Sequence, residues 1–242
     1  MSALTRWMDA RLYAGYSDNW DNQRLRQYLM ERLKSDHAIL DLGAGRGALV
    51  EMNFKGTVKF VAGVDPDPVV HENPFLDEAK TLAVPDAKIP YPDESFNIVF
   101  SNNVLEHVNN PGNLFDEIYR ILQPGGFLIS KTPNKRYYVP AIARLTPHRF
   151  HEFINERRGR KRQDTFPTVY RCNTPEEVQK FAAHSGFKVI DLQMWEGRPE
   201  YLRLFAISYF MGYLYERLVN SFEAMSKFRC VIVFTLEKPK KS

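Results

Sequence analysis

An apolar run that enters a glycine-rich turn, ILDLGAGRG at residues 39–47, constrains the fold of this chain more than any other feature. A second apolar run, residues 58–64, ends at Asp65 and Pro66. Short apolar runs bounded by turn residues are typical of buried strands. The segment between them, RGALVEMNFKG, has room for two or three helical turns, so we expect a parallel βαβ unit with a short crossover.

The same alternation of strand and helix continues along the chain. Helical spacing of apolar residues follows Pro111, and a second helix is predicted between the N-cap Thr174 and the stop at Gly186. This alternation predicts an α/β fold, with an antiparallel strand added at the end of the chain. The predicted strands cover residues 36–42, 58–64, 80–84, 96–101, 127–130, 187–195 and 228–238.

Composition sets the broad class. Hydrophobic residues make up 44% and charged residues 26% of the 242 residues, as in ordinary globular proteins. The net charge of +4 is spread along the chain, so we expect no DNA-binding surface. Cys172 and Cys230 have no metal-ligand spacing, and we expect two buried thiols, no metal site and a cytoplasmic protein.

Two segments interrupt the strand and helix alternation. We expect one domain, residues 1–242, in which residues 1–35 form a helical cap and residues 36–133 form the cofactor-binding half. Residues 134–171 and 196–227 are insertions after the fifth and sixth strands. Open α/β sheets bind ligands at the carboxyl ends of their strands. Both insertions are therefore predicted to form the side of the domain that binds the second substrate, the acceptor.

The glycine turn raises the question of which ligand it holds. Gly43, Gly45 and Gly47 also fit a dinucleotide-binding pattern, so the glycines alone leave the ligand open. Asp41, just before the turn, would repel a pyrophosphate and attract an ammonium group. Asp65 is placed to accept hydrogen bonds from ribose hydroxyls. A ribose and an amino group without a pyrophosphate indicate S-adenosylmethionine.

Four segments then resemble one family in order and spacing. They are LDLGAGRG, GVDPDP, PDAKIPYPDESFNIVFSNNVLEHV and EIYRILQPGGFLISKTPN. Over about residues 36–133 the chain resembles the class I S-adenosylmethionine-dependent methyltransferases, and among them the small-molecule type similar to those of quinone biosynthesis. The resemblance implies a Rossmann-like, mostly parallel sheet of seven strands with an antiparallel last strand and helices on both faces.

The resemblance also implies a cofactor site. Gly43 and Gly45 would lie against the methionine part of S-adenosylmethionine, Asp86 would bind the adenine amino group, and Asn102 would border the methionine part. The segment after Asp65 departs from the family because Pro74 interrupts the expected helix. The full set of implied cofactor residues is Asp41, Gly43, Ala44, Gly45, Gly47, Asp65, Pro66, Asp86, Ala87 and Asn102.

Methyl transfer needs positioning more than a protein nucleophile. A hydroxyl acceptor would also benefit from a base, and His107 is the candidate because it follows the fourth strand on the ligand side. The alternative is that His107 only fixes the local backbone at the start of a helix.

The sequence is less informative about the region that would bind the acceptor. Residues 134–153, with Arg136, Tyr137, Tyr138, His148, Arg149 and His151, form either a lid or a surface insertion. RRGRKR at 157–162 is typical of a solvated loop. The uncharged segment 204–215 is too short to span a membrane and would be a core helix, a dimer contact or an apolar wall, with peripheral membrane contact left open.

We therefore expect a methyltransferase that acts on a small molecule, with amphipathic and sugar-bearing acceptors as candidates. The alternatives are a nucleotide-dependent oxidoreductase and a non-catalytic S-adenosylmethionine-binding partner subunit. A DNA adenine methyltransferase is disfavoured, because SNNV stands where those enzymes carry a [DN]-P-P-[FYW] motif. The oligomeric state is left open.

Overall fold

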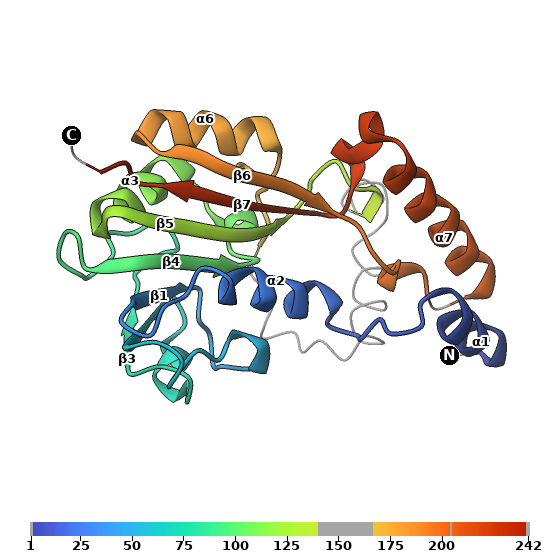
Figure 1. Cartoon of the computed structure of the whole chain (residues 1–242), viewed down its shortest axis with the longest axis horizontal. Helices are drawn as coiled ribbons and strands as arrows, with labels where there is room; N and C mark the ends of the chain where they lie inside the picture. The colour runs from blue at the N-terminus through green and yellow to red at the C-terminus, as the bar shows by residue number, and fades with distance from the viewer. Residues whose placement is uncertain (1, 140–166, 204, 241–242) are drawn as a thin grey trace. The chain divides into compact units, whose positions relative to one another are not determined.

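The computed structural model describes residues 2–139, 167–203 and 205–240 (Figure 1). His148, Arg149, His151 and the RRGRKR segment lie outside the described residues, as does most of the predicted lid. The chain forms two compact units, and each is described by itself. The first comprises Met1–Asp18, Pro133–Thr168 and Met194–Val231, and the second comprises Asn19–Thr132, Val169–Gln193 and Ile232–Ser242.

A seven-stranded sheet is the core of the second unit. Its strand order is β3-β2-β1-β4-β5-β7-β6, and the pairs from β3 to β5 are parallel. β7 runs antiparallel to its neighbours, with the N–H of Gly125 bonded to Lys238 O. The predicted Rossmann-like fold is therefore confirmed. The strands are β1 Ala38–Leu42, β2 Phe60–Asp65, β3 Glu78–Thr81, β4 Phe96–Asn102, β5 Leu122–Pro133, β6 Lys188–Trp195 and β7 Val231–Glu237.

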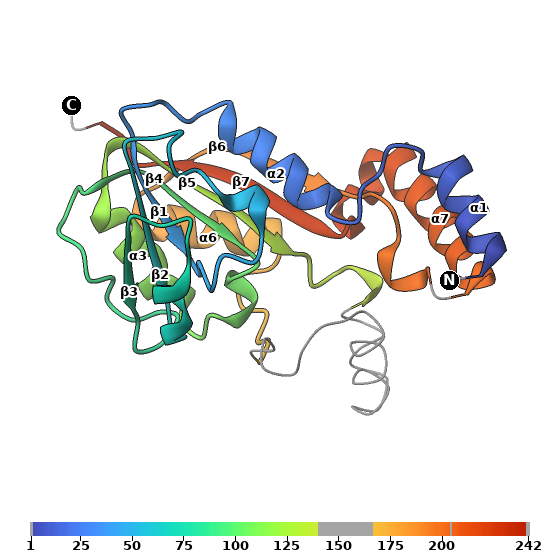
Figure 2. The same ribbon diagram turned by 90° about the horizontal axis from the view of Figure 1, so that it is seen from below.

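Helices cover both faces of this sheet (Figures 1 and 2). α2, Trp20–Met30, lies on one face, and α3, Pro111–Ile121, lies beside α6, Pro175–Ser185, on the other. The predicted caps of α6 are confirmed: the Thr174 side chain accepts a hydrogen bond from Glu177 N, and Gly186 is left-handed. Both helices on the second face begin with a proline in the first turn, where its missing N–H costs nothing.

The register brings the carboxyl ends of the central strands together. Leu42 at the end of β1 pairs with Val64 of β2 and with Ser101 of β4. Asn102, the last residue of β4, pairs with Lys131 of β5. Side chains at these strand ends therefore meet at one edge of the sheet, where open α/β folds bind their ligands.

The predicted crossover helix after the glycine turn is wrong. Between the turn and β2 only a single 3-10 turn forms, η1 at Val50–Met52. Three left-handed glycines delay any helix, and the Arg26 guanidinium donates hydrogen bonds of 2.8 and 2.7 Å to the carbonyls of Glu51 and Asn53. The segment after Asp65 is also only a 3-10 turn, η2 at Pro68–Glu72.

Three smaller expectations are corrected. β3 ends at Thr81, three residues earlier than predicted, because hydrogen bonds between Asp77 and Val61 align the chain before residue 78. β5 starts at Leu122, so the Pro-Gly-Gly segment belongs to the strand. Cys172 is buried as expected, whereas Cys230 is only half-buried, and neither forms a disulfide.

Two helices pack together in the first unit. α1, Ala3–Leu12, contacts α7, Ala206–Ser221, through Met8, Tyr13 and Tyr209. The Tyr13 and Tyr209 rings stack with their centroids 5.9 Å apart. Two 3-10 turns, η5 Glu200–Leu202 and η6 Glu223–Phe228, flank α7.

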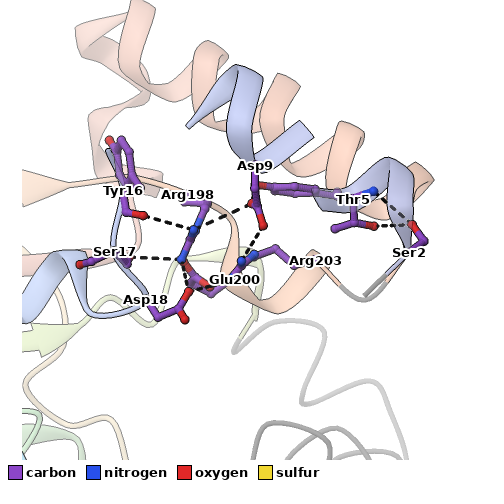
Figure 3. A network of polar contacts seen from close by, with 10 residues as sticks. Ser2, Thr5, Asp9, Tyr16, Ser17, Asp18, Arg198, Glu200 and Arg203 are labelled. Atoms are coloured by element: carbon purple, nitrogen blue, oxygen red, sulfur yellow. Dashed lines mark hydrogen bonds and ion pairs between the residues drawn. The ribbon is translucent and has the colours of Figure 1, made fainter. Parts of the chain in front are cut away.

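A network of ion pairs fixes α1 to the chain before α7 (Figure 3). Arg198 Nη2 lies 2.7 Å from Asp18 Oδ1, and Arg203 Nη2 lies 2.6 Å from Asp9 Oδ2. Both arginines also bind the Glu200 carboxylate. Because Arg198 is buried, these partners are needed to offset the loss of hydration of its charge.

Candidate cofactor site

Two of the three glycines in the turn after β1 leave no room for a side chain. Gly43, Gly45 and Gly47 have φ angles of +77°, +50° and +75°, which other residues rarely adopt. A Cβ on Gly43 would lie 2.3 Å from Val104 Cγ2, and one on Gly47 would lie 2.4 Å from Asn73 Oδ1. The backbone path therefore requires glycine at both positions.

The amide groups of the turn point back into the protein. The N–H groups of Gly43 and Ala44 donate to Val64 O at 2.8 and 3.2 Å, and that of Gly45 donates to Asp65 Oδ2 at 2.9 Å. A phosphate cradle depends on such N–H groups and on the start of a helix. These three N–H groups are already bonded and only a 3-10 turn follows, so the geometry disfavours a pyrophosphate.

Asp41 lies beside the turn in a buried position. Among the described residues, no side-chain hydrogen bond to its carboxyl is found, and the Asp65 charge is its main electrostatic neighbour. Burial, and secondly Asp65, raise the pKa of Asp41 to about 8. No cation of the described residues is near enough to lower the pKa of Asp41.

Asp65 ends β2 and holds the local backbone. Its Oδ2 accepts from Gly45 N, and its Oδ1 accepts from Asp67 N at 2.8 Å, across Pro66. Burial raises the pKa of Asp65, and these backbone bonds oppose the rise. Each carboxylate oxygen can accept a second hydrogen bond, so ribose hydroxyls remain compatible with this arrangement.

Asn102 contributes a second unsatisfied acceptor at the end of β4. Its Nδ2 donates to Asn22 Oδ1 at 3.0 Å, but its Oδ1 is buried without a hydrogen-bond partner in the described part of the chain. Its neighbour Lys131 is fully buried, with Nζ 2.6 Å from Asn22 Oδ1 and 2.5 Å from Asp21 Oδ2. This lysine was not predicted from the sequence, although a charge directly after a predicted buried strand is a usable signal.

Asn73 was also missed, and it supports the turn. Its Nδ2 donates to the carbonyls of Ala44 and Gly45 at 3.0 and 3.2 Å, and its Oδ1 accepts from Phe75 N. The signal in the sequence is the Asn-Pro pair at residues 73–74, which was interpreted only as an interruption.

Asp86 and Ala87 have different surroundings. Asp86 Oδ2 accepts from Asn110 N at 2.8 Å, next to the start of α3, and Ala87 N donates to Val84 O within its own turn. In the described part of the chain, these hydrogen bonds join the two residues to the start of α3 and to their own turn rather than to the glycine turn. Their predicted contacts with adenine therefore stay predictions.

His107 lies in the 3-10 turn η3, Leu105–His107, rather than in the first turn of a helix. Its Nε2 is 3.9 Å from Glu106 Oε1, and about a quarter of its side chain is exposed. The buried Glu106 accepts a hydrogen bond of 3.3 Å from the Thr132 hydroxyl, and burial raises its pKa. A carboxyl with access to His107 is thus present beside the strand ends.

The described residues contain no cluster of three or more His, Cys, Asp or Glu side chains that would hold a metal ion. Within the same residues, no helix combines the length and the apolar character needed to cross a bilayer.

The fold is that of a Rossmann-like domain, and comparison with known proteins gives the family. A family of methyltransferase domains matches residues 14–192. An uncharacterized methyltransferase of Mycobacterium sp. strain JLS is 29% identical over 124 residues, which are 50% of this chain and 49% of the relative. The chain thus matches about half the length of that relative.

Solved structures show the same fold. An S-adenosylmethionine-dependent methyltransferase from Mesorhizobium loti has a TM-score of 0.56 at 14% identity, covering 91% of this chain and 98% of that one. A phosphoethanolamine N-methyltransferase of Haemonchus contortus, in complex with S-adenosylhomocysteine, has a TM-score of 0.54 at 17% identity, covering 99% and 61%. This chain belongs to the methyltransferase-domain family, and the predicted class I membership and cofactor, S-adenosylmethionine, are confirmed.

Proposed function

We propose that this chain transfers the methyl group of S-adenosylmethionine to a small-molecule acceptor, with amphipathic or sugar-bearing molecules as the candidate class. The observation that carries the proposal is that two acceptors, the buried Asp41 carboxyl and Asn102 Oδ1, have no hydrogen-bond partner within the described part of the chain. A cationic donor such as the ammonium group of the methionine part would satisfy both of them.

Different residues of the site bind different parts of S-adenosylmethionine. Asp41 and Asn102 bind the ammonium end, with the closely approachable backbone of Gly43, Ala44, Gly45 and Gly47 beside it. Asp65, followed by Pro66, binds the ribose, and Asp86 with the Ala87 backbone binds the adenine. S-adenosylmethionine supplies an electrophilic methyl carbon when bound.

Positioning of the acceptor supplies much of the rate, since orientation alone is worth about 7 to 11 kcal/mol. We propose His107 as the base that takes a proton from a hydroxyl acceptor, with Glu106 orienting its ring. Residues 134–171 and 196–227 are proposed to form the acceptor side of the single domain. The Haemonchus neighbour, in complex with phosphomonomethylethanolamine, shows that this fold can bind a small molecule.

The test is a calorimetric titration of the full chain with S-adenosylhomocysteine and, in parallel, with NADH. Micromolar binding of the former that is lost in Asp65→Ala, with no binding of NADH, supports the cofactor assignment. Binding of NADH alone would instead favour an oxidoreductase.

Activity needs a second assay, because a partner subunit would also bind S-adenosylhomocysteine. Labelled methyl from S-adenosylmethionine is followed into the small-molecule fraction of a cell extract. Transfer by the wild type that is lost in Asp65→Ala supports an enzyme, whereas tight binding without any transfer favours a non-catalytic subunit.

A further inference from the structure

The α7 helix has one packed face and one exposed apolar face. Its packed face consists of Tyr209, Gly212, Glu216 and Val219, which follow helical spacing and are buried. A Cβ on Gly212 would lie 2.6 Å from Pro199 Cβ, so the helix sits directly on the preceding chain. The packed face therefore fixes which side of α7 points outward.

The outward side carries large apolar residues. Their exposed fractions run from 47% for Leu218 to 79% for Ile207. Exposed apolar residues scattered singly are normal, but a continuous stripe marks an interaction surface. The stripe consists of Ile207, Phe210, Met211, Leu214 and Leu218, with Phe205 and Phe222, also exposed, at its two ends.

α1 adds a second exposed stripe. Leu4 and Trp7 are 55% and 60% exposed and lie three residues apart, on the side of α1 next to its packed residues Thr5 and Met8. α1 and α7 lie side by side in both views (Figures 1 and 2). We call the exposed residues of the two stripes together the α1–α7 face.

Each stripe carries one arginine. Arg11 follows Trp7 by four residues, and Arg217 follows Leu214 by three, so each lies on its stripe. Both are exposed, and Arg217 keeps about half of its side chain accessible while it contacts Glu216. No carboxylate belongs to either stripe, since Glu216 lies on the packed face.

We propose that the α1–α7 face binds the surface of membranes that contain anionic lipids. Apolar side chains enter the interface, Trp7 lies at the headgroup level, and the two arginines contact lipid phosphates. The helix lies in the plane of the interface, because its 16 residues reach only about 24 Å and do not span a bilayer. Arginine rather than acidic residues on both stripes favours an anionic surface over a second copy of the same face, which would place like charges together.

The test uses flotation of the full chain with vesicles of phosphatidylglycerol and phosphatidylcholine, or of phosphatidylcholine alone. We expect binding to the anionic vesicles and at least tenfold weaker binding to the neutral ones. Met211→Gln with Leu214→Gln should weaken anionic binding at least tenfold. The matched control is Val189→Gln with Ile190→Gln, since both residues are exposed on β6, and it should bind as the wild type does.

Charge and depth are tested separately. Arg11→Gln with Arg217→Gln should weaken anionic binding by about 25-fold, at roughly fivefold per arginine. The charge control is Lys180→Gln with Lys188→Gln, since both lysines are exposed in the second unit. Trp7 fluorescence should shift to the blue on vesicle binding, and Trp7→Phe should remove the shift.

Circular dichroism verifies that each variant is folded before its binding is compared. Three results would overturn the proposal: no binding to either vesicle, equal binding by the α7 variant and the wild type, or a dimer in solution that the α7 variant breaks without any vesicle binding. The last result would assign the face to a second copy of the chain.

Discussion

The pH dependence of cofactor binding follows from the Asp41 carboxyl. Its pKa is raised to about 8, chiefly by burial, so at neutral pH most of the ligand-free protein carries a proton there. If the cofactor ammonium binds the ionised form, that proton must leave on binding. Below about pH 8 the dissociation constant then rises by up to tenfold per pH unit.

The expected magnitude can be measured directly. Between about pH 7.5 and about pH 6, the dissociation constant of S-adenosylhomocysteine should rise about 20-fold. Calorimetry in two buffers of different ionisation enthalpy should show close to one proton released at the lower pH. In Asp41→Asn, which cannot ionise, binding should be weaker and the profile flat. A flat profile in the wild type would refute the assigned role of Asp41.

Three further predictions concern stability and turnover. Because the folded-state pKa of Asp41 is raised, the stabilisation from its bound proton is fully present below about pH 4 and is lost as the pH rises toward 8. The Asp41→Asn variant cannot ionise, so it should be more stable than the wild type by a few kcal/mol near pH 8. Urea unfolding should show no difference between the two proteins near pH 4. Gly43→Ala combines a clash with Val104 with the cost of a left-handed φ, so its free energy of unfolding should fall by about 2 to 5 kcal/mol. Gly56→Ala has φ +79° and open space, so its free energy of unfolding should fall by only about 1 to 2 kcal/mol. Equal losses for the two variants in thermal unfolding would show that the clash at Gly43 is relieved. His107→Gln should lower kcat about 100-fold with an unchanged dissociation constant for S-adenosylhomocysteine, and loss of both together would argue for a structural histidine.

Much of the fold could be predicted because strand and helix signals are local. The apolar runs that became β1, β2 and β4 and the capped helix α6 are encoded by adjacent residues. The crossover helix was mispredicted because the conformation of the connecting segment depends on Arg26. This arginine lies far away in sequence and donates hydrogen bonds to carbonyls of the segment. Such long-range hydrogen bonds leave no periodic signal.

The positions of three candidate site residues in the fold could be predicted for the same reason, whereas their role in binding stays a prediction. Asp41, Asp65 and Asn102 stand at strand ends, where position alone indicates a ligand site. Asn73 and Lys131 were missed because their partners come from other elements: Asn73 bonds to the glycine turn, and Lys131 bonds to α2. A single sequence without its fold does not show which strand end a distant side chain reaches.

We propose that the glycine turn faces an ammonium group rather than a phosphate. This can be tested by comparing the binding of S-adenosylhomocysteine with that of its analogue lacking only the amino group. We expect at least a 30-fold loss of affinity for the analogue, because two acceptors, at Asp41 and Asn102, lose a charged donor. Equal affinity for the two compounds would contradict it.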